Sequence, residues 1–216
     1  MSLEENLVRI PVGKAIVEGN LAMPNGAKGL VLFAHGSGSG RFSPRNQYVA
    51  KMLNKAGIAT LLIDLLTKEE EAVDMRTSES RFDIDLLSAR LIAATEWIKK
   101  NLSTKNLPLG YFGASTGAAA ALRAAAEFPE DVKAVVSRGG RPDLSMEYLS
   151  KVRASTLLLV GGRDTAVLEL NKKAMKNLLS EKKLKVVPGA SHLFEEPGKL
   201  EEVAGLSIDW FMAKLS

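Results

Sequence analysis

The sequence contains no cysteine in its 216 residues, and it has only two histidines and 6% aromatic side chains. Without cysteine the chain cannot form a disulfide, a thiolate metal site or a cysteine nucleophile. Long hydrophobic runs are also absent: residues 30–34 and 116–122 fall far short of the ~20 apolar residues that a membrane-spanning helix needs. The amino terminus is acidic and lacks the basic start and apolar core of a secretory signal. We therefore expect a cytoplasmic protein that does not bind a membrane.

The chain has no strong excess of charge of one sign. The 29 Lys and Arg and the 25 Asp and Glu give a net charge of +4, and the two signs are interspersed. Nucleic-acid binders more often gather their basic residues on one face or in one arm, so we expect no nucleic-acid partner. The length and the 46% hydrophobic content fit one globular domain over residues 1–216.

Short apolar runs alternate with helical patterns from about residue 29 to the end. The runs are rich in Val, Leu and Ile without strict alternation, which is typical of strands covered on both faces. We expect strands at residues 29–34, 58–66, 107–112, 132–137, 156–160 and 184–187, after a hairpin of residues 7–12 and 15–23. We expect helices at residues 44–56, 87–98, 116–127, 170–178 and 200–215, and an irregular surface loop at 68–80. This order predicts an α/β fold with a mostly parallel sheet of about eight strands flanked by helices.

The loop Gly113 to Gly117 has the pattern G-x-S-x-G between an expected strand and an expected helix. Ligands bind such sheets at the carboxyl ends of the strands, which is where this loop lies. The pattern places its serine on a sharp turn that lifts the hydroxyl above the sheet, and small neighbours are needed because the backbone is crowded. We predict that Ser115 is a nucleophile; the alternative is a tight turn without catalytic function.

A serine nucleophile needs a base within hydrogen-bond reach, and the chain offers His35 and His192. His192 follows the last expected strand, where a base could reach Ser115. His35 begins a glycine-rich loop, where we expect it to hold the shape of the loop. We predict that His192 is the base.

The imidazole in turn needs an acid that fixes its tautomer. Asp164 follows a strand and lies between Ser115 and His192, giving the order Ser, Asp, His that this architecture uses. The alternative function for Asp164 is to cap the helix that follows it. Asp64 and Asp143 also follow strands and are alternative acids.

An oxyanion needs at least two oriented N–H donors. Thr116 offers one at the start of a helix, and Ser37, next to Gly36 in the loop of residues 35–41, offers the second. We predict that Ser37 and Thr116 form the oxyanion hole and that Gly36 contacts substrate. The loop lacks a G-K-[ST] ending and does not match G-x-G-x-x-G, so a nucleotide site fits poorly.

Arginines also gather near the strand ends. They are Arg41, Arg45, Arg138 and Arg141. Guanidinium groups clamp carboxylate or phosphate, so we predict that Arg41, Arg138 and Arg141 bind a substrate that carries an anionic group. The alternative is a solvated arginine that pairs with Asp143 or Glu147.

The chain resembles an α/β-hydrolase of the dienelactone-hydrolase-like branch in its strand order and motifs from about residue 7 to residue 215. Residues 35–46, 111–121, 137–143 and 188–197 resemble a bacterial group of small hydrolases, some of which are attached to, or encoded beside, a phosphoribosyltransferase. The resemblance implies that Ser115, Asp164 and His192 are the catalytic triad and that Ser37 and Thr116 are the oxyanion donors. Dienelactone hydrolases proper carry cysteine where this chain has Ser115, so the nearer expectation is a serine carboxylesterase.

We therefore expect a serine hydrolase that cleaves small or short-chain carboxylic esters without a metal or an organic cofactor, as a monomer or homodimer. Residues 138–155 are too few for a large cap domain, which predicts an open, shallow pocket. The alternatives are an acyltransferase or perhydrolase with the same triad, and a non-catalytic binding partner of a phosphoribosyltransferase.

Overall fold

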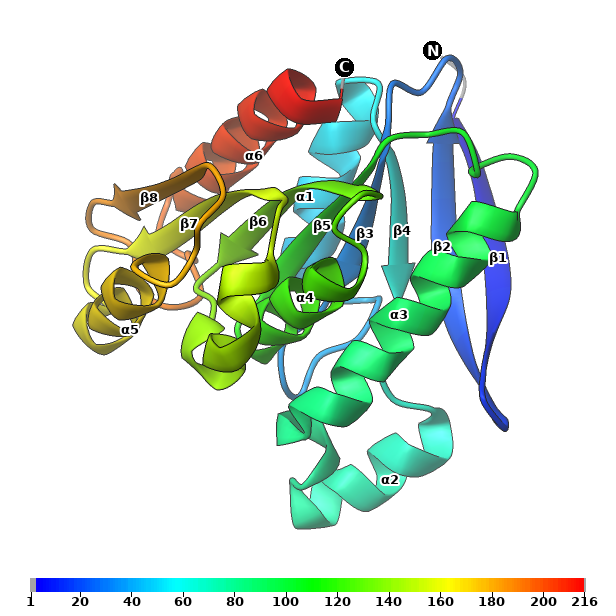
Figure 1. Ribbon diagram of the computed structural model, residues 1–216, viewed down its shortest axis with the longest axis horizontal. Helices are drawn as coiled ribbons and strands as arrows, with labels where there is room; N and C mark the ends of the chain where they lie inside the picture. The colour runs from blue at the N-terminus through cyan, green and yellow to red at the C-terminus, as the bar shows by residue number, and fades with distance from the viewer. Residues whose placement is uncertain (1–2, 216) are drawn as a thin grey trace.

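The computed structural model describes residues 3–215, which form one eight-stranded sheet with helices on both of its faces (Figure 1). The strands are β1 (Leu3–Val12), β2 (Ala15–Pro24), β3 (Leu30–Ala34), β4 (Ala59–Ile63), β5 (Leu109–Ala114), β6 (Val132–Arg138), β7 (Ser155–Gly161) and β8 (Lys182–Val187). Their order across the sheet is β1-β2-β4-β3-β5-β6-β7-β8. The hairpin of β1 and β2 joins β4 antiparallel, and β4, β3, β5, β6, β7 and β8 run parallel. Five consecutive parallel pairs bring the loops after these strands to one edge of the sheet.

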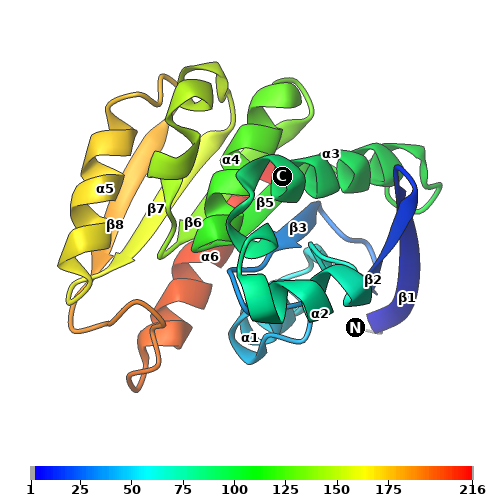
Figure 2. The same ribbon diagram turned by 90° about the horizontal axis from the view of Figure 1, so that it is seen from below.

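The helices cover the sheet in two layers, as Figure 2 shows from below. They are α1 (Pro44–Lys55), α2 (Lys68–Thr77), α3 (Ile84–Lys100), α4 (Thr116–Glu127), α5 (Thr165–Met175) and α6 (Lys199–Leu215). One core packs α3, α4 and α5 against the sheet, with Leu91, Ala121 and Ala174 fully buried. A second core packs α1 and α6 against the opposite face, through Leu53 and Phe211. The predicted α/β fold, with a mostly parallel eight-stranded sheet between helical layers, is confirmed.

Residues 68–80 differ from the sequence prediction of an irregular loop, because most of this segment is the helix α2. Asp74 is the one buried side chain of α2, so the helix has no apolar stripe to reveal it. Its start was readable in the sequence: Thr67 and Glu70 form a capping box, in which each side chain accepts a hydrogen bond from the other residue's backbone N–H. The periodicity of apolar residues, on which the prediction depended, misses a helix of this kind.

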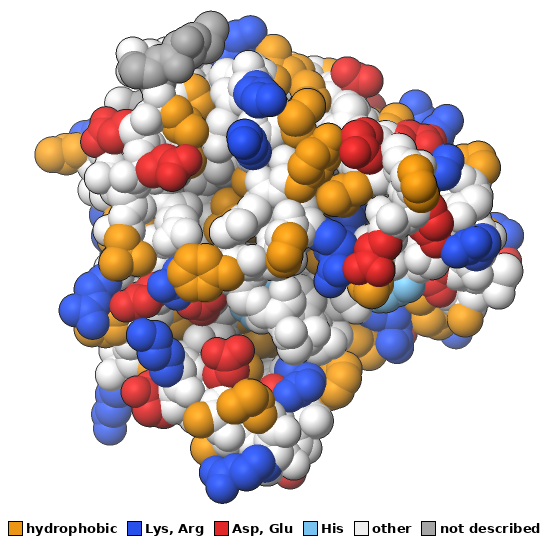
Figure 3. All heavy atoms as spheres, turned by 180° about the vertical axis from the view of Figure 1, so that it is seen from behind, with side chains coloured by type: hydrophobic (Ala, Val, Ile, Leu, Met, Phe, Trp, Pro, Cys, Tyr) orange, Lys and Arg blue, Asp and Glu red, His pale blue; other side chains and the backbone are white. Residues whose placement is uncertain are grey.

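Between β6 and β7 the chain makes only 3₁₀ turns over Pro142–Lys151, and no cap domain is inserted there. In the part of the chain that the structure describes, no helix combines the length and the apolar character needed to cross a bilayer. Figure 3 shows acidic and basic side chains scattered over one face without a large patch of either sign. Because no cap domain is inserted between β6 and β7, no such domain covers the loops at the strand ends.

Candidate active site

Ser115 joins β5 to α4 in a strained backbone conformation. Its φ of 50° and ψ of −121° lie in a region that residues other than glycine rarely adopt. The Ser115 N–H donates to the carbonyl of Arg138 at 3.2 Å, and the Ser115 carbonyl accepts from the N–H of Arg141 at 3.1 Å. These bonds to the loop after β6 hold the turn, because a strained residue persists only where its surroundings fix it.

The glycines on either side of Ser115 are required by close backbone contacts. A Cβ on Gly113 would lie 2.4 Å from the Cα of Ala118, and one on Gly117 would lie 2.4 Å from the carbonyl oxygens of Ala34 and His35. No larger residue fits at either position without moving the backbone. The G-x-S-x-G pattern thus corresponds here to a sharp strand-to-helix turn with the serine at its apex.

His192 and Asp164 are hydrogen-bonded to each other, with Nδ1 of the imidazole 2.6 Å from Oδ2 of the carboxylate. Asp164 follows β7 and occupies the cap position of α5, but its side chain makes no capping hydrogen bond. The carboxylate therefore bonds to the imidazole of His192 and does not cap α5. The alternative acids are engaged elsewhere, Asp64 with Arg41 and Asp143 with Arg141.

Ser115 and His192 line a single pocket of about 180 Å³. The other residues that line it are Gly36, Ser37, Ser39, Ser43, Arg45, Asn46, Ala114, Arg138 and Leu193. Within residues 3–215 no hydrogen bond joins Ser115 to His192, and such looser geometry is common in catalytic sites that hold no substrate. The pocket brings together the hydroxyl of Ser115 and the imidazole of His192, and the Asp164 carboxylate bonds to that imidazole from outside the pocket lining.

Two N–H groups beside the pocket are available to an oxyanion. Thr116 is the first residue of α4, so its N–H has no acceptor within the helix. The N–H of Ser37 donates to no backbone carbonyl in the described part of the chain. A Cβ on the neighbouring Gly36 would lie 3.1 Å from the Cβ of Ser115, so this loop lies directly against the nucleophile.

His35 fixes the conformation of that loop. Its Nε2 accepts a hydrogen bond from the N–H of Leu65 at 2.9 Å, so Nδ1 carries the proton and donates to the carbonyl of Gly36, also at 2.9 Å. Burial lowers the pKa of His35, which keeps the ring neutral. The position agrees with the structural function predicted from the sequence.

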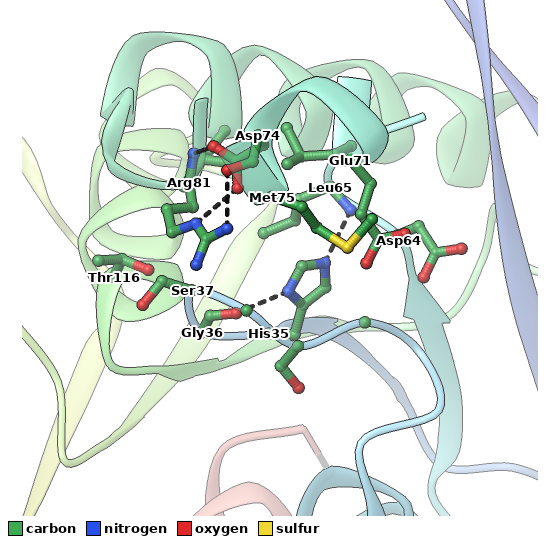
Figure 4. Close-up of a pocket in the computed structure, with 15 residues that line it drawn as sticks. His35, Gly36, Ser37, Asp64, Leu65, Glu71, Asp74, Met75, Arg81 and Thr116 are labelled. Carbon is green, nitrogen blue, oxygen red and sulfur yellow. Dashed lines mark hydrogen bonds and ion pairs between the residues drawn. The ribbon is translucent and has the colours of Figure 1, made fainter. Parts of the chain in front are cut away.

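A second pocket of about 400 Å³ adjoins the first along Gly36, Ser37 and Ser39 (Figure 4). Its further lining includes His35, Asp64, Leu65, Glu71, Asp74, Met75, Arg81 and Thr116. Helix α2 supplies Glu71, Asp74 and Met75, and Asp74 holds Arg81 through Nε at 2.6 Å. The two pockets together border residues 36–39.

The structure separates the arginines that the sequence grouped together. Arg41 lies outside both pockets and pairs with Asp64 and Glu18, so its terminal nitrogens are occupied. Arg141 pairs with Asp143 through two hydrogen bonds of 2.8 and 2.9 Å, which is the alternative considered for it. Arg138 lines the pocket with Ser115.

Arg45, which was grouped with the other arginines from the sequence but not assigned to the substrate, lines the pocket at the start of α1. Two further residues beside the site were not assigned a function from the sequence. Gly139 has a φ of 53°, and a Cβ there would lie 3.1 Å from the carbonyl oxygen of His192. Glu196 accepts the N–H of Ser191 at 3.0 and 3.1 Å, which lowers its pKa to about 2 and fixes the loop that carries His192. In the sequence, Gly139 was marked only by its position one residue after a strand end. Glu196 was marked only as a carboxylate four residues after His192.

Among residues 3–215 no three His, Asp or Glu side chains are grouped so that they could hold a metal ion. The groups that the site itself offers are the hydroxyl, the imidazole, the carboxylate and the backbone N–H groups described above.

Known proteins are similar to this chain in sequence and in fold. Residues 17–207 match the dienelactone hydrolase family. A dienelactone hydrolase crystal structure from Anabaena variabilis ATCC 29413 is 58% identical, with 99% of both chains covered and a TM-score of 0.98. An esterase from Pyrococcus furiosus shares the fold at 19% identity, with a TM-score of 0.77 over 99% of this chain and 92% of that one.

Two curated proteins of Mycobacterium tuberculosis, from strains CDC 1551 and H37Rv, are 55% identical over 213 residues and are named provisionally as phosphoribosyl transferases. The match covers 99% of this chain but 47% of theirs, so the chain spans about half the length of these relatives. The extent of the family match and the similarity to the Anabaena variabilis structure show that the chain belongs to the dienelactone hydrolase family.

Proposed function

We propose that the chain is a serine hydrolase of small carboxylic esters. The observation that carries the proposal is the pocket that Ser115 and His192 share, with His192 bonded to Asp164 at 2.6 Å. Its membership of a hydrolase family supports the same reaction class, as does the esterase activity named for a protein of the same fold. The fold alone would not assign an activity, and the arrangement of the site is the stronger argument.

In the proposed reaction the hydroxyl of Ser115 attacks the ester carbonyl while His192 accepts its proton through Nε2. Asp164 holds Nδ1–H and stabilises the imidazolium that forms. The N–H groups of Ser37 and Thr116 donate to the oxyanion of the tetrahedral intermediate. His192 then returns the proton to the leaving alcohol, which departs and leaves an acyl group on Ser115.

In the second half of the cycle a water molecule gives a proton to His192 and attacks the acyl-enzyme. Collapse of the second tetrahedral intermediate releases the carboxylic acid and returns the proton to Ser115. Dienelactone cleavage itself is not part of the proposal, because the chain has Ser115 where the family resemblance implies a cysteine in dienelactone hydrolases proper.

The first prediction concerns Ser115→Ala. We expect the wild type to hydrolyse p-nitrophenyl acetate and butyrate faster than the octanoate, because the 180 Å³ pocket is small. We expect kcat to fall by roughly 10⁵- to 10⁶-fold in the variant, which leaves only binding and the oxyanion donors. Release of p-nitrophenolate at saturating ester measures both effects.

Ser103→Ala is the matched control, since Ser103 lies in a surface turn with its hydroxyl bonded to Asn101. Activity that survives Ser115→Ala would exclude the proposed nucleophile. Adding methanol or hydrogen peroxide to the assay and identifying the products distinguishes hydrolysis from acyl transfer with the same triad. A wild type inactive on every ester tried would favour a non-catalytic binding partner.

A further inference from the structure

Arg138 is buried beside the proposed nucleophile without an acidic partner. It is the last residue of β6, it is 6% exposed, and it lines the pocket with Ser115 and His192. Its one hydrogen bond from the guanidinium is a 3.4 Å contact with Oδ1 of Asn46, and its buried Nε has no acceptor. In the described part of the chain no carboxylate forms an ion pair with it, whereas Arg41, Arg90 and Arg141 each have at least one such partner.

A buried charge of this kind is costly unless something compensates it. Burial and the neighbouring charge of Arg45 lower the pKa of Arg138 to about 10, so the guanidinium remains charged at neutral pH. The other buried arginines, Arg41 and Arg90, have their charge compensated by carboxylates. Arg138 instead has no carboxylate partner among residues 3–215 and lines the pocket.

The other groups around Arg138 are also complementary to negative charge. Arg45 lines the pocket, and its buried Nε lacks an acceptor, although its Nη1 pairs with the exposed Glu195 at 2.6 Å. Ser43, Arg45 and Asn46 belong to the amino-terminal turn of the twelve-residue helix α1, whose dipole adds positive potential there. No Asp or Glu is among the described residues that line this pocket.

We propose that Arg138, with Arg45 and Asn46, forms an anion-binding subsite, separate from the oxyanion hole. This subsite selects esters that carry a carboxylate or phosphate group close to the scissile bond. The inference rests on the proposed hydrolase function and adds the substrate class to it. Because the same 180 Å³ pocket holds Ser115, the anionic group and the reacting carbonyl belong to one small molecule. Arg138 is then the residue that determines specificity, while the triad performs the chemistry.

The test compares two esters of equal acyl length, p-nitrophenyl hemisuccinate and p-nitrophenyl butyrate, which differ in a terminal carboxylate. We expect the wild type to prefer the hemisuccinate. In Arg138→Met we expect the ratio of kcat/KM for hemisuccinate over butyrate to fall roughly 10- to 100-fold, as expected for losing hydrogen bonds to a charged group, mainly through KM. Arg153→Gln, which removes an exposed arginine paired with Glu130, should leave the ratio unchanged.

Thermal unfolding separates this effect from a structural one. Replacing a buried charge that has no acidic partner by an apolar side chain should leave the midpoint of Arg138→Met equal to or above that of the wild type. A lower midpoint together with equal losses on both esters would overturn the proposal. If Arg138→Met does not fold, Arg45→Gln must lower the ratio, and an unchanged ratio in that variant would contradict the subsite.

Inhibition of butyrate hydrolysis by succinate and by inorganic phosphate identifies which anion the subsite prefers. We expect one of them to compete with the ester in the wild type and to do so at least 10-fold more weakly in Arg138→Met; absence of inhibition by either would count against the subsite. Failure of the hydrolase proposal is distinguishable, because it would abolish turnover of both esters in the wild type. Anion-dependent thermal stabilisation of the wild type, lost in Arg138→Met, would then still support the subsite, and its absence would refute it.

Discussion

At the scale of single residues, Gly139 shows how backbone conformation and catalytic geometry depend on each other. Its φ of 53° lies in the left-handed region that favours glycine. A Cβ added there would also lie 3.1 Å from the carbonyl oxygen of His192 and 3.5 Å from the imidazole. The position thus carries two separable constraints, one on the backbone and one on the proposed base.

Gly139→Ala should therefore lower kcat as well as stability. We expect a loss of about 1–2 kcal/mol in the free energy of unfolding from the left-handed conformation, and a further fall in kcat because the imidazole is displaced. Gly13→Ala is the matched control, since Gly13 has a φ of 66° and nothing within 4 Å of an added Cβ. Urea denaturation and ester kinetics on both variants measure the two effects. Equal kcat values in the two variants would show that Gly139 does not position His192.

At the scale of secondary structure, α2 is a polar helix whose stability depends on its ends and on a few ion pairs. Thr67 and Glu70 cap its start, and Glu70 also pairs with Arg90 on α3. Asp74 of α2 binds Arg81, which lies in the turn that follows the helix. Because α2 has one buried side chain, we expect that it can open locally with a small loss of packing.

Thr67→Ala should weaken α2 locally and leave the rest of the fold intact. Loss of an N-cap costs about 1 kcal/mol, which should speed hydrogen exchange of the amides of residues 68–77 by roughly 5-fold. Thr77→Ala, at the other end of the helix, removes two long bonds of 3.4 Å, one to the carbonyl of Val73 and one from the N–H of Glu79, and serves as the control. Exchange that rises equally in α4 and the central strands would mean that α2 does not open as a separate unit.

At the scale of the whole molecule, the sheet is held between two cores, and His35 adds a polar link between its central strands. The loop after β3 carries the ring, and the N–H of Leu65 after β4 donates to it at 2.9 Å. Burial lowers the pKa of His35 below its ordinary value of 6.5, so its imidazole binds a proton less readily in the folded protein than in the unfolded chain. This difference links the stability of the fold to pH.

The free energy of unfolding should consequently fall as the pH drops below about 6.5, where the unfolded chain binds more protons at this site. His35→Gln keeps an acceptor at this position and cannot titrate, so its stability should be lower at pH 7.5 but should depend less on pH down to 5. Urea denaturation of both proteins at several pH values measures the slopes. Parallel slopes would show that His35 does not contribute to the pH dependence.

The sequence was sufficient to predict the layers of the fold because most elements bury an apolar face. The Ala-rich segment 116–127 is α4 with the predicted bounds, and the apolar run 132–137 is β6 to within one residue. Helix α2 was missed because its stability comes from caps and ion pairs, which leave no apolar periodicity.

The sequence by itself determined the order of strands and helices, the turn at Ser115 and the order of Ser115, Asp164 and His192, since local spacing and chain order specify them. It could not determine which charged groups pair with one another. Arg41, Arg138 and Arg141 look alike in sequence, yet two of them have carboxylate partners and one has none. Only the tertiary structure decided this, because the partners of a charge are fixed by which strand ends and helix termini the folded sheet brings together.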